Sequence, residues 1–396
     1  MINISRIRDL KKCVIPLTSR SILKVSGPDA VKLVQGLTTN NMGRLVDSQA
    51  PSPTSLYTGF LSSTGRLLFD AVVFHQQNVE VISSSASRVA KSDGSSGEQQ
   101  LFIDVDSEVA SRAIEHLHYY KIRNKATIEN VTEEFALFSV LDKTYKSVRN
   151  DQLFEHLKQQ KCTVMMDPRH DAMGLRILVP SSKNSMKNEV LSNYPEEKED
   201  VYNLYRVQNG IPQGVKDYSY DKVIPLEYNF DLLNGVDFHK GCYLGQELTS
   251  RTHYTGLIRK RLFPVVMSSD SPKEHSVKKE HHLLFSQSVV DSLDVQAPPA
   301  DTELKITILT GSTSPFNEKQ PHQHSNTPPP PPSRTTEKVI SSYNNIGLAI
   351  VKVDHIDSAS FKSTNIKDPK GRSLELLEPC WWSKVVGIQV PTQQVS

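Results

Sequence analysis

Two stretches near the N-terminus set the secondary-structure pattern of this chain. Residues 21–42 read SILKVSGPDAVKLVQGLTTNNM, and residues 55–74 read SLYTGFLSSTGRLLFDAVVF. The first stretch predicts a short strand over 21–25, a turn, and then a helix with apolar residues at i, i+3, i+4 and i+7, namely Ala30, Leu33, Val34 and Leu37. In the second stretch, two β-rich runs flank Thr64-Gly65, which predicts a hairpin.

The middle of the chain continues this mixture of strands and helices. An apolar stripe predicts a helix over 107–120, and a later helix over Glu199–Asn209 is expected to end at Gly210. Further strands are predicted at 79–85, 126–141 and 174–179. The Ser- and Gly-rich run at 83–100 is expected to be a loop.

The C-terminal third alternates between polar, low-complexity sequence and strand-like runs. Residues 268–282 are polar and charged, and residues 312–336 include five consecutive prolines, which favour polyproline II and cannot build a core. Strand-like sequence resumes at 346–356 and 373–379. We therefore expect a barrel-like C-terminal domain that is interrupted by a long insertion.

The composition is that of an ordinary globular protein. Of the 396 residues, 37% are hydrophobic and 23% are charged, which excludes a wholly disordered or fibrous chain. The net charge is +2 and no basic stripe with interleaved aromatic residues is present, so no nucleic-acid partner is expected. No apolar run approaches the roughly 18–20 residues that a membrane-spanning helix needs. The four cysteines are far apart, which indicates a reducing compartment rather than a disulfide framework.

The first 20 residues carry five basic side chains against one acidic side chain, Asp9. Wound as a helix, Ile4, Ile7 and Leu10 share one face, the amphipathic form of a mitochondrial transit peptide. A plain basic N-terminus is the alternative interpretation of the same residues.

The chemistry of the chain is concentrated in residues 236–262, VDFHKGCYLGQELTSRTHYTGLIRKRL. Gly241 and Gly245 flank Cys242, so the backbone can turn tightly around the thiol. A cysteine near a helix N-terminus and close to Lys240 is expected to have a lowered pKa. One interpretation is a reactive or metal-binding thiolate, and the other is a small buried cysteine. A single cysteine cannot hold an iron–sulfur cluster alone, because such clusters normally take four protein ligands.

The octet KGCYLGQE at 240–247 resembles the K-G-C-[FY]-x-G-Q-E signature of the YgfZ-type proteins, relatives of the folate-dependent aminomethyltransferase of glycine cleavage, the T-protein. Arg251 falls where that family carries an arginine soon after the octet. Other segments resemble family motifs in the same order along the chain: 23–42, 56–70, 119–128, 166–178, 204–214 and 346–356. An ordered set of motifs is far more specific than any one of them.

The resemblance implies an α+β fold arranged as a three-domain ring, with two α/β lobes, a C-terminal β-barrel and a tetrahydrofolate-type pocket. The domain boundaries expected on this basis are a transit segment at 1–19, a folate-binding-like core at 20–255, a barrel domain at 256–386 with an insertion at about 268–338, and a tail at 387–396.

The eukaryotic branch of this family implies a function in the mitochondrial matrix, late in the assembly of [4Fe–4S] clusters. The implied partners are A-type iron–sulfur scaffold proteins and client [4Fe–4S] enzymes. Cys242 maps to the functional cysteine and would contribute to a transient cluster shared with a partner. Lys240 and Arg251 would hold the thiolate or the anionic tail of a folate. The other residues implied at the pocket are Tyr243, Gln246, Glu247 and Asp70.

One departure from the aminomethyltransferase pattern bears on catalysis. Those enzymes resemble G-G-x-x-D-D at the hairpin, whereas Phe69 here takes the place of the first acid and Asp70 remains. Phenylalanine cannot transfer a proton, so amine-linked methyl transfer is not expected and enzymatic turnover stays open. The two alternative functions are a folate-dependent aminomethyltransferase-like enzyme and a non-catalytic adaptor that uses the proline-rich insertion.

Overall fold

The structure is a computed structural model of the whole chain. The residues that it describes are 10–47, 53–75, 99–142, 162–182, 194–254, 256, 258–267, 285, 289, 296–308, 337–353, 356, 364–382 and 385. These residues divide into two compact units. The first unit comprises Met1–Asn203, Pro212–Thr255 and Lys279–Leu284, and the second comprises Leu204–Ile211, Gly256–Lys278 and Phe285–Ser396.

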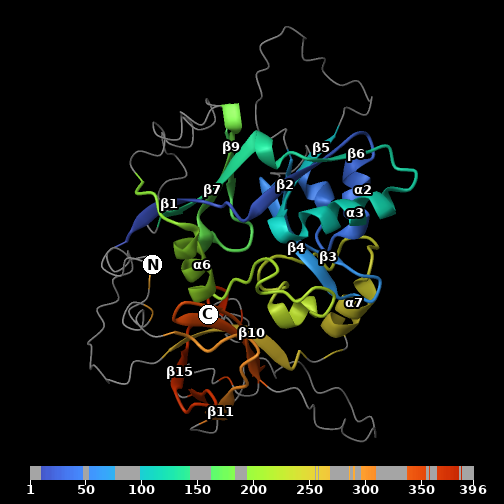
Figure 1. Cartoon of the computed structure of the whole chain (residues 1–396). Coiled ribbons are helices and arrows are strands. Elements are labelled where there is room, and N and C mark those ends of the chain that lie inside the picture. The colour runs from blue at the N-terminus through green and yellow to red at the C-terminus, as the bar shows by residue number, and fades with distance from the viewer. Residues whose placement is uncertain are drawn as a thin grey trace, which may run out of the picture. The chain divides into compact units, whose positions relative to one another are not determined.

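A five-stranded antiparallel sheet and two helices form one half of the first unit (Figure 1). The strand order is β3-β4-β5-β2-β6, with β2 at Arg20–Ser26, β3 at Ser55–Leu61, β4 at Leu67–His75, β5 at Gln100–Asp106 and β6 at Thr127–Asn130. Helices α2 (Ala30–Leu37) and α3 (Ala110–Lys121) pack against this sheet. All four apolar residues predicted on the first helical face are buried in α2, which confirms that prediction.

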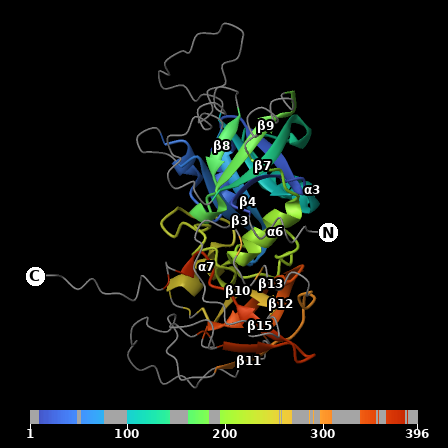
Figure 2. The same cartoon turned by 90° about the vertical axis from the view of Figure 1, so that its left-hand side faces the viewer.

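A four-stranded antiparallel sheet forms the other half of the first unit, where β7, β8 and β9 lie side by side (Figure 2). Its order is β1-β7-β9-β8, with β1 at Lys12–Pro16, β7 at Phe135–Asp142, β8 at Thr163–Met166 and β9 at Leu175–Pro180. The single strand predicted over 126–141 is wrong, because β6 and β7 belong to different sheets and a 3-10 turn over Thr132–Glu134 separates them.

Strand β5 was not predicted, although it lies at the centre of the five-stranded sheet. Its five interior residues are all buried, so it lacks the alternation of buried and exposed residues that marks a half-exposed strand. The strand predicted at 79–85 and most of the predicted loop at 83–100 lie outside the described residues.

The N-terminal leader over 1–19 stays a prediction, and its first nine residues lie outside the described part of the chain. The residues that follow are folded. Lys12–Pro16 form β1, which pairs with β7 from Lys12 opposite Asp142 to Pro16 opposite Phe138, and Cys13 is fully buried. Residues 12–16 thus supply a strand to the core of the first unit.

The second unit is built on a six-stranded antiparallel sheet of order β11-β14-β15-β10-β13-β12. The strands are β10 (Lys260–Met267), β11 (Lys305–Ile308), β12 (Lys338–Tyr343), β13 (Ile346–Lys352), β14 (Thr364–Lys367) and β15 (Ser373–Leu376). Strand β11 falls inside the predicted insertion, so that insertion is not continuous low-complexity sequence. Its polar run at 268–282 and its proline-rich run at 312–336 lie outside the described residues.

The remaining helices are α6 (Glu199–Gln208), α7 (Gln246–Tyr254) and short 3-10 turns at Met42–Leu45, Ser107–Val109, Asp171–Met173 and Pro225–Tyr228. Helix α6 matches its predicted range and crosses the boundary between the two units.

In the second unit, Trp381 is fully buried and its indole nitrogen donates to the carbonyl oxygen of Gly210 at 3.1 Å. Among the described residues, no helix combines the length and the apolar character that crossing a bilayer requires.

Candidate functional site

Cys242 is the only one of the four cysteines that is fully exposed. Cys13 and Cys162 are buried, and Cys380 is half-buried. The Cys242 thiol lies on a turn that leads directly into helix α7. At the start of α7, the Gln246 side-chain oxygen accepts a hydrogen bond from the backbone N–H of Tyr243 at 3.1 Å, so the turn and the helix are bonded together. The interpretation of Cys242 as a small buried cysteine is therefore wrong.

Lys240 fastens this turn to the C-terminal end of α2. Its ammonium nitrogen donates to the backbone carbonyl oxygens of Gln35, Thr38 and Asn40 at 2.7, 2.6 and 2.9 Å. A positive charge at this end of a helix complements the helix dipole. Burial lowers the pKa of Lys240 to about 7, whereas three carbonyl acceptors are the geometry that suits the charged ammonium. All three ammonium hydrogens are used here, so Lys240 positions the turn and has none left for an anionic ligand.

The turn also meets the tip of the β3–β4 hairpin through two glycines. Gly65 and Gly245 have φ angles of +81° and +75°, a region that side chains other than glycine rarely adopt. A Cβ atom on Gly65 would lie 2.7 Å from the Gly245 carbonyl oxygen, and one on Gly245 would lie 2.3 Å from the Ser62 carbonyl oxygen. The backbone N–H of Leu244 donates to Gly36 of α2 at 2.9 Å. Helix α2 and the hairpin together hold the loop that carries Cys242.

The other residues predicted around Cys242 lie on the same turn and helix. Glu247 and Arg251 are exposed on α7, and Tyr243 is half-buried. The Lys240 ammonium lies 4.8 Å from the centre of the Tyr243 ring, within range of a cation–π interaction. Burial raises the pKa of Tyr243 to about 12, so its phenol stays neutral at physiological pH.

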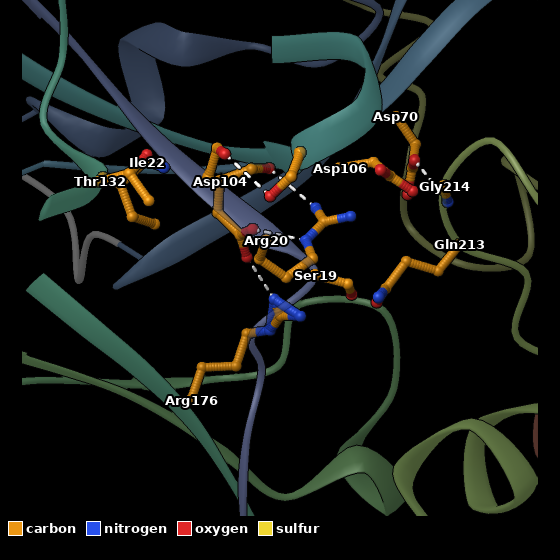
Figure 3. A network of polar contacts seen from close by, with 12 residues as sticks. Ser19, Arg20, Ile22, Asp70, Asp104, Asp106, Thr132, Arg176, Gln213 and Gly214 are labelled. Carbon is orange, nitrogen blue, oxygen red and sulfur yellow. Dashed lines mark hydrogen bonds and ion pairs between the residues drawn. The ribbon is translucent and has the colours of Figure 1, made fainter. Parts of the chain in front are cut away.

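Asp70 lies in a different place from the Cys242 turn. It is inside β4, three residues after the first strand residue Leu67, a rise of roughly 10 Å from the hairpin end of the strand. The Asp70 carboxylate is buried and accepts from the backbone N–H of Gly214 at 2.9 Å (Figure 3). The Tyr57 hydroxyl lies 3.5 Å from Asp70 and 2.8 Å from the Tyr218 hydroxyl. Burial raises the pKa of Asp70 above its usual range, which favours a carboxyl group that can keep its proton.

A buried ionic network lies beside Asp70 and joins the two sheets of the first unit (Figure 3). Arg20 of β2 donates to Asp104 of β5 at 2.6 Å, and Arg176 of β9 forms ion pairs with the same Asp104 and with Asp167. Arg169 pairs with Asp167 at 2.6 Å and also donates to Gln213 and Tyr202 at 2.8 Å each. One nitrogen of Arg20, Nη1, is buried without a hydrogen-bond partner.

Sequence reasoning missed most of this network. Arg169 makes three hydrogen bonds to the Asp167 carboxylate, so Asp167-Pro168-Arg169 is a turn with a tethered guanidinium. Asp104 and Arg176 each interrupt an apolar strand run, LFIDVD and LRILVP. A charge inside such a run is a usable signal, because charged residues are rarely fully buried unless they are paired.

Histidines also occur in pairs in the C-terminal third, at 281–282 and at residues 322 and 324, but these lie outside the described residues. Within the described ranges, no group of three His, Cys, Asp or Glu side chains lies close enough to hold a metal ion.

The fold defines the class of protein. The aminomethyltransferase T of the glycine cleavage system from Bartonella henselae matches with a TM-score of 0.56, covering 94% of this chain and 87% of that chain. The two sequences are only 10% identical, so this likeness concerns the fold alone. The α+β architecture of a T-protein-like chain is thereby confirmed.

Sequence similarity narrows the class to one family. No family model matches the chain. Among curated proteins, the mitochondrial iron–sulfur cluster assembly factor IBA57 homolog of Dictyostelium discoideum is 47% identical over 419 residues, covering 100% of both chains. IBA57 of Mus musculus is 34% identical, covering 65% of this chain and 66% of its own, and IBA57 of Homo sapiens is 33% identical, covering 63% and 65%. The chain belongs to the IBA57 family.

Proposed function

We propose that this protein is an iron–sulfur cluster assembly factor of the mitochondrial matrix that acts late, in the formation of [4Fe–4S] clusters, through the Cys242 thiol. The general role follows from the family, whose members are named mitochondrial iron–sulfur cluster assembly factors. The single observation that carries the role of the thiol is its placement. Cys242 is the exposed cysteine, and its loop is fastened to α2 and to the hairpin.

The cluster is cargo in this proposal, and Cys242 is one of its ligands while it is transferred. One thiolate supplies one of the four protein ligands that a cluster normally takes. The remaining ligands would come from an A-type scaffold protein and then from the client [4Fe–4S] enzyme. A loop held at a constant position supports such a handover, because little conformational entropy is lost when the partner binds.

A tetrahydrofolate-type ligand is proposed at a second place, around Asp70. Two features of the first unit fit it. Asp70 is a buried carboxyl with a raised pKa next to the Tyr57 hydroxyl, which can exchange hydrogen bonds with a pterin ring. Arg20 Nη1 is a buried donor without a partner, which can serve a carbonyl or carboxylate oxygen. Such a folate would be bound by Asp70 and Arg20 and would not require Lys240, whose ammonium is already used.

The test is complementation of cells that lack their own family member. The full-length protein, Cys242→Ala and the matched control Cys380→Ala would be expressed in mitochondria. Aconitase activity and protein lipoylation report [4Fe–4S] formation, and a two-iron cluster protein serves as the specificity control. We expect the wild type and Cys380→Ala to restore both activities, and Cys242→Ala to restore neither although it folds and accumulates normally.

Two results would overturn the proposal in different ways. Full restoration by Cys242→Ala would remove the thiol role and leave the family role intact. Failure of the wild type, despite good mitochondrial expression, would remove late [4Fe–4S] assembly itself.

A further inference from the structure

The outer face of α3 carries large apolar side chains that the described residues of the first unit do not cover. Tyr119 is 76% exposed and Ile122, directly after the helix, is 81% exposed. Arg112 lies two turns before Tyr119 on the same face, and its guanidinium stacks 5.0 Å from the ring centre of Tyr220, which is 41% exposed. We refer to Tyr220, Arg112, Tyr119, Ile122 and Arg123 as the α3 stripe.

Ile122 is held in a backbone conformation that suits glycine. Its φ and ψ angles are 44° and −100°, and the backbone N–H of Asn124 donates to the Lys121 carbonyl oxygen at 2.7 Å. These are the features of a type II′ turn with Ile122 at its first central position, where glycine is preferred. A β-branched residue there costs on the order of 1–3 kcal/mol. Because the Ile122 side chain is exposed, packing against the described part of the chain does not offset that cost.

The turn that presents Ile122 is anchored to the turn before α2. The backbone N–H of Lys125 donates to the Asp29 carboxylate at 2.8 Å, and the backbone N–H of Asp29 donates to the Lys125 carbonyl oxygen at 3.2 Å. Gly27 leaves no room for a side chain, because a Cβ atom there would lie 2.5 Å from the Lys125 carbonyl oxygen. The turn before α2 therefore holds the strained residue in place.

The charge around the stripe is mostly positive. The basic residues there are Arg112, Lys121, Arg123, Lys125 and Lys222, against the exposed acids Glu108, Glu115 and Asp221. Tyrosine and arginine are enriched among the residues that dominate the binding energy of protein interfaces. Glu115, which lies between Arg112 and Tyr119, would be repelled by an anionic membrane surface. The mixture of basic and apolar side chains in the stripe instead fits a protein surface with acidic side chains around an apolar patch.

A chain of contacts connects the stripe with the Cys242 turn. Tyr220 is two residues from Lys222, whose carbonyl oxygen accepts from the Arg66 guanidinium at 3.1 Å. Arg66 follows Gly65 at the hairpin tip, and Gly65 packs against Gly245. A protein that binds the stripe would thus bind next to the hairpin that supports the Cys242 turn.

We propose that the α3 stripe is the docking surface for the protein that shares a cluster with Cys242, and that this partner presents acidic residues around an apolar patch. The proposal rests on the proposed function, because the A-type scaffold protein is its named occupant. The stripe supplies affinity and orientation, and Cys242 supplies the thiolate. Docking and ligation are then separable by mutation.

The experiment measures the affinity of the full-length protein for a purified A-type scaffold protein without a cluster, at two salt concentrations. The variants are Ile122→Gly, which removes the apolar side chain and relieves the backbone strain, and Arg123→Glu, which reverses an exposed charge. Lys198→Glu is the matched control, an exposed charge reversal outside the stripe. Ligation is tested separately by Cys242→Ala in the complementation assay.

We expect Ile122→Gly and Arg123→Glu each to weaken binding about tenfold, and Arg123→Glu also to reduce its salt dependence. Lys198→Glu should bind within about threefold of the wild type. Ile122→Gly should melt at the same or a higher temperature than the wild type, so a loss of binding cannot be attributed to unfolding. If both stripe variants bind the scaffold protein as tightly as the wild type does, the α3 stripe is not the docking surface, and the proposed function still stands. A wild type that does not bind the scaffold protein would overturn the proposed partner itself.

Discussion

At the scale of single residues, His116 shows how a titratable side chain enters the core of the first unit. Its ring lies edge-on to Phe60 and Phe69, with centroids 6.1 Å away in both cases. The Nε2 atom is buried without a hydrogen-bond partner. Burial lowers the pKa of His116 to about 4 from its usual 6.5. Phe69 thus belongs to an aromatic cluster, on the face of β4 opposite to Asp70.

His116 makes stability depend on pH in the mildly acidic range. The unfolded chain binds a proton at His116 below about pH 6.5, whereas the folded chain resists protonation until about pH 4. The proton uptake at His116 therefore does not change the free energy of unfolding above pH 6.5. As the pH falls from 6.5 toward 4, it lowers the free energy of unfolding by on the order of 2–3 kcal/mol. Chemical denaturation of wild type and His116→Phe at pH 7 and pH 4.5 would measure it.

The variant should lose less stability between these two pH values than the wild type. Its pH dependence should be reduced but not abolished, since burial also lowers the pKa of His75. His118→Gln, an exposed substitution on the same helix, should behave like the wild type. An unchanged slope in His116→Phe would contradict the assignment.

At the scale of elements, the hairpin tip and the Cys242 turn depend on each other through Gly65 and Gly245. Gly245→Ala would place a methyl group 2.3 Å from the Ser62 carbonyl oxygen and strain a positive φ angle. We expect it to destabilise the first unit by about 2 kcal/mol or more and to release the turn from the hairpin. Hydrogen exchange of the amides at 241–246, together with thermal unfolding, would measure both effects.

Gly241→Ala is the matched control on the other side of Cys242. A Cβ atom there meets nothing within 4 Å, so its stability and exchange should stay close to those of the wild type. Equal effects of the two substitutions would show that the Gly65–Gly245 contact does not hold the turn.

At the scale of the first unit as a whole, Arg176 joins the two sheets. It bridges Asp104 in β5 and Asp167 before β9, and all three side chains are about 1% exposed. Arg176→Met would leave a carboxylate buried without its counter-charge, which typically costs about 3–5 kcal/mol. Chemical denaturation should show this loss. Lys24→Met, which removes the more exposed ion pair with Glu129, should cost less than about 1 kcal/mol. Comparable losses would show that the network does not hold the sheets together.

Much of the local structure could be predicted from sequence. The apolar spacing of α2 and the turn residues of the β3–β4 hairpin report local geometry, and both predictions are confirmed. One predicted strand is really two, and seven strands were missed: β1, β5, β8, β10, β11, β12 and β14. A strand whose interior residues are all buried has no period to detect, and the sheet that a strand joins depends on partners far along the chain.

In the candidate site too, local features were predicted from sequence and long-range contacts were not. The octet around Cys242 was found from sequence because glycines, a cysteine and a helix start lie within eight residues. The sequence by itself thus determined the family, the order of many elements and the place of the candidate cysteine, since these depend on neighbours along the chain. Only the tertiary structure decided that Lys240 binds three carbonyl oxygens of the α2 end and that Asp70 lies apart from Cys242. It also paired Arg20 with Asp104, because long-range contacts and burial arise only when distant segments meet.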